Sequence, residues 1–410
     1  MEPRRTYQDT HPFLTFKAPT TYCTLSYKVG EAFSKCQHLV GTPLPPMLAA
    51  SLGRMYLIKG AQATAAIEGN TLTESQVQDI ADKRSDIPRS QAYMKQEIEN
   101  ILSLLDVIYD EVGTEKPWRL TPEWLRAVNY QLLEGIECED HVEPGEFTTT
   151  QLTVGDGTYR PVNPADVEHC LQKLCDWLNE MIVFAQSDAR DDDRFMQAFF
   201  AATLAHLYIA WIHPFGDGNG RTARALEAAI LAHTQLAPWV SCALLSDHYN
   251  RTRSRYYQRL DQARRSEENV TKFLFYAAEG FVDLLREQIT DVQRLQRHTA
   301  WINYVHEVFQ RETQGDTSKR RRSLVLALRE DQQTKRSDIR RLTTELVEMY
   351  VGKGDRTLSH DLNKLIELNL VEGNPKVGYR SRIETMDAFL PKLDGSFRFL
   401  MEPETTAEAS

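Results

Sequence analysis

The sequence lacks the patterns that mark several common classes of protein. Its six cysteines include no C-x-x-C pair and form no regular framework, so we expect neither a zinc site nor a disulfide scaffold. Free thiols of this kind are typical of a reducing compartment, and we expect a cytoplasmic protein. No run approaches the roughly 20 apolar residues of a membrane span, and the opening MEPRRTYQDTHPF has no apolar signal-peptide stretch. We therefore expect no membrane partner.

An excess of positive charge is also missing. The 410 residues carry a formal net charge of −10, which argues against a surface that binds nucleic acid throughout. Hydrophobic residues make up 41% and charged residues 26%, as in globular proteins that bury a sizeable core. Residues 316–386 differ, because they hold 15 Lys and Arg against 11 Asp and Glu. This local excess suggests a separate C-terminal module.

Apolar residues recur at three- and four-residue intervals over most of the chain, so the predicted fold class is mostly α. Residues 1–46 are interrupted by prolines and aromatics, and we expect them to be irregular. Thr73 with Gln76 resembles a capping box, and Thr121 before Pro122 resembles another helix start. The expected helices cover most of 47–110 and then 121–133, 164–184, 192–212, 221–234, 246–265 and 269–298.

One segment of the chain has a convincing β pattern. In FTTTQLTVGDGTYRPV, residues 147–162, two threonine-rich runs flank Gly155-Asp156-Gly157, which predicts a hairpin. After Gly315 the basic KRRR precedes two helical stretches and NPKVGYRSRIE, the order of helix, turn, helix and a short β wing. The tail MEPETTAEAS is polar, and we expect it to be disordered.

The nonapeptide HPFGDGNGR, residues 213–221, interrupts two apolar helical patterns with turn-forming residues. Pro214 disfavours helical geometry in the residue before it, so the first helix should end at Ile212. The glycines allow successive backbone amides to converge at the start of the next helix, where the helix dipole also favours an anion. Arg221 and Arg224 are three residues apart and can project from the same side of that first turn. Amides and two guanidiniums together suit a polyphosphate.

The same loop holds groups for chemistry on a phosphate. Asp217 would repel an anion unless a divalent cation lies between them, and Mg²⁺ is commonly held by one carboxylate and phosphate oxygens. His213 is the nearby group that can act as a base close to neutral pH. A calcium loop is excluded, because an EF-hand counted from Asp217 would need glycine and glutamate where Thr222 and Ala228 stand. A Walker loop is absent from the sequence.

HPFGDGNGRTAR resembles the Fic signature HPFx[DE]GNGRxxR at every specified position. The resemblance implies a protein adenylyltransferase, which moves AMP from ATP onto a Ser, Thr or Tyr hydroxyl of a target protein, and onto itself. It implies that His213 deprotonates the hydroxyl, that Asp217 holds Mg²⁺ and that Arg221 and Arg224 grip the β- and γ-phosphates. The other implied nucleotide-binding residues are Gly216, Gly218, Asn219, Gly220, Val154, Gly155, Tyr256 and Tyr257, with Asn219 adding a side-chain donor to the phosphates.

The predicted hairpin has a role in the same resemblance. PGEFTTTQLTVG is similar to the family pattern P-G-E-[FY]-R-T-x-Q-x-x-V-G, with Thr148 where arginine is usual. In the family this segment is a flap that pins the target by strand addition, so we expect an unidentified target protein to dock on 147–162. Fic cores often pair, which makes a homodimer a further expectation.

TAAIEGN, residues 64–70, resembles the inhibitory motif [ST]-x-x-x-E-[GN] of Fic proteins. The resemblance implies that Glu68 forms a bidentate pair with Arg224 and takes the place of the γ-phosphate. In some family members this glutamate also supports removal of AMP. The implied organisation is an N-terminal helical region at 1–115 with the inhibitory helix at about 61–69, a Fic core at 116–300, a winged helix at 316–395 and a tail at 396–410.

Two alternatives stay open. The C-terminal winged helix could make the chain a DNA-binding transcriptional regulator, although its charge excess is weak for a protein that contacts many phosphates. The residues expected to face a DNA groove are Arg356, Ser359, His360, Asn363 and Lys364. Alternatively, a Fic site could transfer another nucleotide such as UMP.

Overall fold

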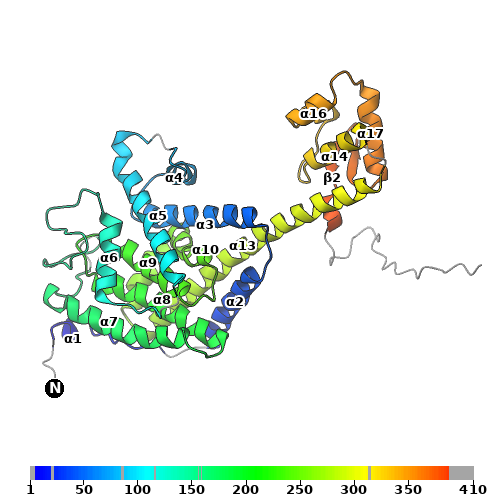
Figure 1. Ribbon diagram of the computed structural model, residues 1–410. Helices are drawn as coiled ribbons and strands as arrows, with labels where there is room; N and C mark the ends of the chain where they lie inside the picture. Colours follow the sequence, from blue (N-terminus) through cyan, green and yellow to red (C-terminus); the bar gives the residue numbers. More distant parts are fainter. Residues whose placement is uncertain are drawn as a thin grey trace, which may run out of the picture. The chain divides into compact units, whose positions relative to one another are not determined.

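The computed structural model describes residues 5–19, 23–84, 87–114, 117–155, 157, 159–312 and 315–386 (Figure 1). The chain divides into two compact units, Met1–Asp291 and Val292–Ser410. Both the predicted N-terminal helical region and most of the predicted core fall within the first unit. The tail predicted at 396–410 lies outside the described residues.

The described part of the first unit is built of helices. In chain order these are α1 Tyr7–Thr10, α2 Cys23–Val40, α3 Pro46–Ile67, α4 Glu74–Ala81, η1 Arg89–Gln91, α5 Ala92–Val112, α6 Pro122–Leu133, α7 Pro164–Ala185, α8 Asp191–Ile212, α9 Asn219–Ala232, α10 Trp239–Cys242, α11 Leu245–Arg251 and α12 Arg253–Ala263. The helix α13, Glu267–Gln310, passes the boundary between the units. The capping box at Thr73 and the Thr121 N-cap are both confirmed.

The helix α8 forms the centre of the first unit, with α7 and α9 packed against it (Figure 1). Its buried residues surround the whole helix, as the apolar sequence AFFAATLAHLYIAWI predicted. By length and hydropathy α8 is the one helix among the described residues that could cross a membrane. Since 83% of its apolar window is buried inside the unit, it is a core helix.

Three expectations about local structure were wrong. Residues 23–40, expected to be irregular, form α2, whose buried side chains Leu25, Val29, Ala32 and Cys36 have helical spacing. The helix expected at 246–265 is divided at Thr252, where φ is −117° and ψ is 33°. The helix expected at 269–298 instead continues to Gln310, because Trp301, Val305 and Phe309 extend its apolar face into the core of the second unit.

The hairpin predicted at 147–162 forms no pair of strands among its described residues. Only an isolated antiparallel bridge joins Val154 to Tyr159, and a second bridge joins Phe147 to Phe215 of the HPFGDGNGR loop. The Thr148 amide donates to the Pro214 carbonyl at 2.8 Å. The segment therefore uses its backbone to pair with the loop, which leaves fewer groups for a ladder of its own.

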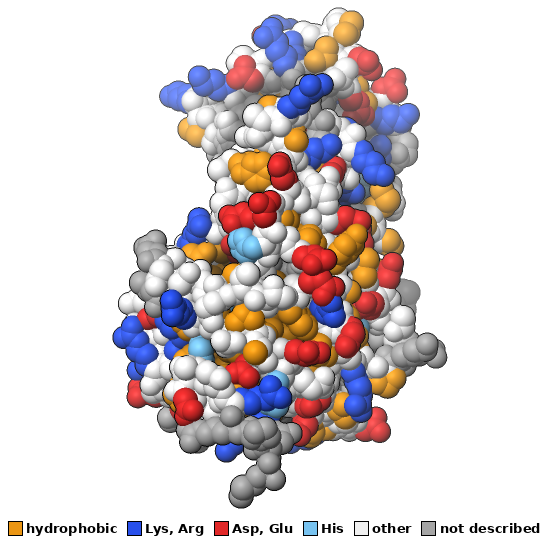
Figure 2. Space-filling view, turned by 90° about the vertical axis from the view of Figure 1, so that its left-hand side faces the viewer, with side chains coloured by type: hydrophobic (Ala, Val, Ile, Leu, Met, Phe, Trp, Pro, Cys, Tyr) orange, Lys and Arg blue, Asp and Glu red, His pale blue; other side chains and the backbone are white. Residues whose placement is uncertain are grey.

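The described second unit contains four helices, a single hairpin and a final 3₁₀ turn. Their bounds are α14 Asp316–Ala327, α15 Arg336–Ile339, α16 Thr344–Met349, α17 Asp355–Glu367, β1 Val371–Asn374, β2 Gly378–Ser381 and η2 Ile383–Met386. The strands are antiparallel, with Val371 opposite Ser381. The upper part of Figure 2 shows Lys and Arg side chains on several parts of the visible face of this unit, with Asp and Glu among them.

A buried polar network ties α8 and α9 of the first unit to α11 and α12. His206 contacts Glu227 Oε2 through Nδ1 at 2.9 Å and the Tyr256 hydroxyl through Nε2 at 2.8 Å. The Tyr249 hydroxyl donates to Glu227 Oε1 at 2.8 Å. All four side chains are almost fully buried. Because each polar atom has a partner, the network stabilises one arrangement of these helices.

Replacing Glu227 should therefore destabilise the first unit strongly. Glu227→Ala leaves His206 and Tyr249 buried without their shared acceptor, which we expect to cost about 3 kcal/mol or more. The free energy of unfolding in urea measures this loss. Glu268→Ala, which removes an exposed carboxylate paired with Lys272, is the control and should leave the urea midpoint unchanged. Equal midpoints for the two variants would contradict this account of the network.

Candidate active site

The HPFGDGNGR loop lies between two buried helices of the first unit. The helix α8 ends at Ile212, as predicted, and His213 adopts a left-handed conformation with φ of 52°. Gly218, with φ of 77°, precedes the start of α9. The loop thus places His213 close to the N-terminal amides of α9, which have no partner within the helix and can bind an anion.

The side chain of Asn219 holds this loop in shape. Its Oδ1 accepts a hydrogen bond from the Phe215 amide at 2.9 Å, and its Nδ2 donates to the Phe215 carbonyl at 2.7 Å. Both polar atoms are engaged within the loop, and the residue is 3% exposed. The Asn219 side chain therefore shapes the loop, while the additional phosphate donor that the family resemblance implied stays a prediction.

A cavity of about 470 Å³ opens over the start of α9. Its lining comes from the end of α3, the flap segment, the end of α8 with its loop, and α12. The lining residues are Glu68, Val154, Gly155, Tyr159, Ala210, Trp211, His213, Asn219, Gly220, Arg224, Tyr256, Tyr257, Leu260, Asp261 and Arg264. The structure thus brings together nine of the thirteen residues predicted for the site.

Arg224 is buried beneath this cavity and is held by residues of the TAAIEGN motif. Its Nη2 donates to Glu68 Oε1 at 2.7 Å, and its Nε donates to Thr64 Oγ1 at 2.7 Å. The pair with Glu68 has one hydrogen bond, so the bidentate geometry predicted for it is not formed. Thr64, the first residue of the TAAIEGN motif, fixes the guanidinium from the other side and also accepts through its carbonyl.

The carboxylate of Glu68 lies against the glycine of the anion site. A β-carbon built on Gly220 would collide with Glu68 Oε1 and lie 3.0 Å from Arg224 Nη1. Burial alone would raise the pKa of Glu68, but Arg224, Arg221 and Arg253 together hold that pKa below its usual range. Glu68 is therefore an anion at neutral pH and is positioned where Arg224 and the start of α9 meet.

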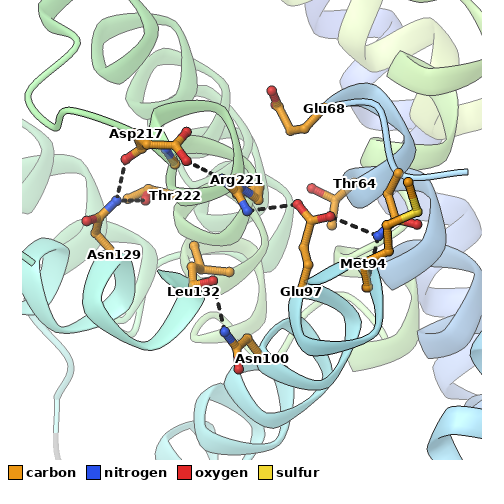
Figure 3. Close-up of polar contacts among 12 residues, drawn as sticks. Thr64, Glu68, Met94, Glu97, Asn100, Asn129, Leu132, Asp217, Arg221 and Thr222 are labelled. Atoms are coloured by element: carbon orange, nitrogen blue, oxygen red, sulfur yellow. Dashed lines mark hydrogen bonds and ion pairs between the residues drawn. The ribbon is translucent and has the colours of Figure 1, made fainter. Parts of the chain in front are cut away.

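Arg221, one turn before Arg224 on α9, lies between two carboxylates (Figure 3). Its Nη1 donates to Glu97 Oε1 on α5 at 2.8 Å, and its Nη2 donates to Asp217 Oδ2 at 3.1 Å. Arg221 and Glu97 are 7% and 6% exposed, whereas the Asp217 side chain is about half exposed. Arg221 Nε is buried with no hydrogen-bond partner among the described residues.

Glu97 is one of the residues of this site that the sequence did not reveal. It occupies the buried face of α5 in line with Ile101, Leu104 and Ile108, so a charged residue stands where the helical period requires an apolar one. This mismatch is the feature of the sequence that could have identified Glu97 as a candidate site residue. Burial raises the pKa of Glu97 despite its contact with Arg221.

His213 lines a second, neighbouring cavity of about 770 Å³. This groove is bounded by Thr150–Thr153 of the flap on one side and by residues 137–142 on the other, and it also includes Gly216 and Asp217. Glu137, Glu139 and Asp217 give it a negative lining without lysine or arginine. Burial lowers the pKa of His213 to about 4, an effect that the Ala210 backbone, Glu68 and Asp217 only partly oppose. The imidazole is therefore neutral at pH 7.

The two predicted tyrosines have different surroundings. Tyr256 is buried and bonded to His206, whereas Tyr257 is 45% exposed and its hydroxyl donates to the Ile67 carbonyl at 3.4 Å. At the end of the cavity far from Arg224, Arg264 stacks on Tyr159 at 4.1 Å and pairs with Asp261. Tyr159, Asp261 and Arg264 were not predicted, because their proximity arises from the return of the flap toward α12.

The residues predicted to contact DNA lie on α17 of the second unit. Arg356, His360 and Asn363 are exposed, and Ser359 and Lys364 are partly buried. His360 contacts Arg321 at 2.9 Å, and Lys364 pairs with Glu367 at 3.0 Å. DNA binding by this unit stays a prediction.

Comparison with known proteins places the site in a family. The Fic/DOC family matches residues 119–231, a range that includes the whole HPFGDGNGRTAR loop. The chain is similar to protein adenylyltransferase fic-1 of Caenorhabditis briggsae, with 29% identity over 49% of this chain and 35% of that protein. It is also similar to protein adenylyltransferase Fic of Nematostella vectensis, with 27% identity over 52% of this chain and 44% of that protein. The chain thus spans less than half the length of these relatives.

Solved structures of Fic proteins share the fold. A Fic family protein from Desulfovibrio desulfuricans has a TM-score of 0.54 at 20% identity, covering 89% of this chain and 98% of that structure. Fic-1 from Caenorhabditis elegans has a TM-score of 0.52 at 23% identity, covering 66% of this chain and 73% of that structure. The matched loop, the helical fold and the named relatives agree, and the chain contains a Fic domain over residues 119–231.

Proposed function

We propose that this Fic-domain protein is a protein adenylyltransferase that moves AMP from ATP onto a hydroxyl side chain of a target protein. The observation that carries the proposal is the position of His213, which lines both the cavity over α9 and the groove beside the flap. A group shared by two cavities can receive a proton from a hydroxyl in one of them while the hydroxyl attacks a phosphate in the other.

The cavity over α9 offers ATP a complementary surface. The amides at the start of α9, with Arg224 and Arg221, would bind the phosphates, because amides and guanidiniums are strong donors to phosphate oxygens. Val154, Gly155, Tyr257 and Leu260 line the remainder of the cavity, where the nucleoside would lie. Transfer of another nucleotide such as UMP uses the same phosphate site and differs only in the base.

The groove beside the flap would hold the target segment. The hydroxyl oxygen attacks the α-phosphorus, the new P–O bond forms, and the bond to the leaving pyrophosphate breaks. His213 accepts the hydroxyl proton through the unprotonated nitrogen of its ring, which is neutral at pH 7. Glu137 and Glu139 line this groove, so an acidic target segment would be repelled.

Asp217 is the residue suited to a metal ion. Its side chain is 52% exposed at the edge of the loop, and one carboxylate with phosphate oxygens is a common set of ligands for Mg²⁺. The described residues include no cluster of three or more His, Cys, Asp or Glu that would hold a metal without substrate. When bound, Mg²⁺ would neutralise charge on the departing pyrophosphate.

Glu68 would hold the enzyme inactive. Its carboxylate binds Arg224 and lies against Gly220, so it competes with a phosphate for both. ATP could enter the cavity, but its phosphates would have to lie elsewhere, with the α-phosphorus out of line with the attacking hydroxyl. The same residue could support AMP removal, which would need a water placed by Glu68.

Removal of Glu68 should activate the protein. Glu68→Gly frees Arg224 from a charged hydrogen bond worth about 1.5–3 kcal/mol, so we expect label transfer from α-labelled ATP to rise about 10- to 100-fold. The measurement is protein-bound label after incubation with Mg²⁺. Asp331→Gly, which removes an exposed carboxylate in the second unit, is the matched control. An unchanged rate of label transfer in a folded Glu68→Gly protein would contradict the inhibitory role of Glu68.

Removal of His213 should abolish transfer in the activated protein. A general base contributes about 10²- to 10⁴-fold, so Glu68→Gly/His213→Ala should lose that factor relative to Glu68→Gly. Binding of ATP, measured by calorimetry, should remain, because the phosphate site keeps Arg224 and its amides. If the double variant labels as fast as Glu68→Gly, another group is the base. The same assay with labelled UTP tests which nucleobase the site prefers.

The titration of His213 should occur well below that of an ordinary histidine. Because burial lowers its pKa to about 4, the imidazole binds its proton only in acid and is a competent base throughout pH 6–8. NMR of protein labelled at histidine, with His213→Ala to assign the signal, measures the midpoint. A midpoint near 6.5 would show that the ring is more hydrated than this geometry allows.

A further inference from the structure

Glu97 connects Arg221 of the Fic loop to the chain just after Glu68, and Glu97 itself is not among the residues that line the cavity. One of its carboxylate oxygens accepts from Arg221 Nη1 at 2.8 Å, and the other accepts from Asn70 Nδ2 at 2.8 Å. Asn70 is 7% exposed and stands two positions after Glu68. A single buried carboxylate on α5 thus joins α9 to the segment that carries the inhibitory glutamate (Figure 3).

Asn70 fixes the path of the chain after α3. Its Nδ2 also donates to the Met94 carbonyl at 3.0 Å, its Oδ1 accepts from the Leu72 amide at 3.0 Å, and its backbone amide donates to the Ala65 carbonyl. Between Glu68 and Asn70 lies only Gly69, whose φ of 104° allows the sharp exit from the helix. Glu68 itself is about one-third exposed and has one hydrogen bond to Arg224. Its placement therefore depends on the anchor that follows it.

We propose that Glu97 is a positioning residue that links Arg221 to Asn70, so that both arginines of the loop hold the Glu68 segment in its inhibitory position. Arg224 holds Glu68 directly, and Arg221 holds the next turn of the chain through Glu97 and Asn70. This inference rests on the proposed adenylyltransferase function, and it adds a second contact that holds the inhibitory Glu68 segment in place.

The link has a physical cost when it is broken. Glu97 and Arg221 are both buried, and loss of either partner leaves a charge without compensation. Asn70, in contrast, is neutral and contacts neither ATP's site nor Arg224. Its removal weakens the link and leaves the Arg221–Glu97 pair intact, which makes it the residue to change first.

Asn70→Ala in the otherwise unchanged chain should raise label transfer from α-labelled ATP about 3- to 10-fold, because it removes the hydrogen bond to Glu97 that anchors the segment after Glu68. In the Glu68→Gly background the same change should alter the rate less than about twofold, because the inhibitory carboxylate is already absent. A rise of the same size in both backgrounds, or no rise in either, would overturn the proposal.

Asn100→Ala is the matched control. Asn100 is 6% exposed on the same helix as Glu97 and donates two hydrogen bonds, to the Leu132 and Glu134 carbonyls, without contacting Arg221 or Asn70 (Figure 3). It should lower stability and leave label transfer unchanged in both backgrounds. Activation by Asn100→Ala equal to that of Asn70→Ala would attribute the effect to general loosening of α5 and overturn the link.

Glu97→Gln tests the role of the carboxylate itself. In the Glu68→Gly background, loss of its charge should raise the KM for ATP more than it lowers kcat, because Arg221 loses the partner that orients it toward the phosphates. A fall in kcat with an unchanged KM would contradict a positioning role for Glu97.

Hydrogen exchange gives a readout that needs no catalysis. Amides of residues 64–72 should exchange faster in both Asn70→Ala and Glu97→Gln, and at the wild-type rate in Asn100→Ala. If Glu68→Gly transfers no label, the proposed function fails, while faster exchange in Glu97→Gln still supports the link. If Glu68→Gly transfers label and Glu97→Gln leaves the exchange of 64–72 unchanged, the link alone fails.

Discussion

The need of the buried Arg224 guanidinium for a negative partner is the constraint on which this structure depends. A buried guanidinium requires a negative partner, and in the absence of nucleotide Glu68 supplies it at 2.7 Å. A phosphate would satisfy the same charge and could also use the amides at the start of α9. Under the proposed function the site would have two ways to neutralise one cation, which is the physical requirement for a switch.

The surrounding helices hold this cation in a fixed place. Thr64 on α3 binds Arg224. Tyr256 lines the cavity and also belongs to the buried network with His206, Glu227 and Tyr249. Buried polar groups with every partner in place tolerate little movement. The Fic loop is consequently attached to the core by polar contacts as well as by the apolar packing of α8, and its small glycine-rich turn can stay precise.

The sequence predicted much of the local structure of the site. Pro214 ended α8 at Ile212, Gly218 and Gly220 allowed the close backbone turn, and the spacing of Arg221 and Arg224 placed both on α9. In the flap the alternation of threonines indicated an extended chain but did not identify all its partners, because only Val154 and Tyr159 pair with each other across the predicted hairpin. Another partner was the loop itself, through Thr148 and Pro214.

The sequence by itself determined the helical class, the Fic loop and the two motifs that Glu68 and Arg224 join, because these follow from local geometry and from motifs of contiguous residues. Only the tertiary structure decided which distant groups meet them. Glu97 reaches Arg221 across 124 positions, and Arg264 meets Tyr159 where the flap returns to α12. Such contacts depend on how the helices pack. A charged residue at a buried position indicates that a partner is needed, but the sequence does not identify which residue that partner is.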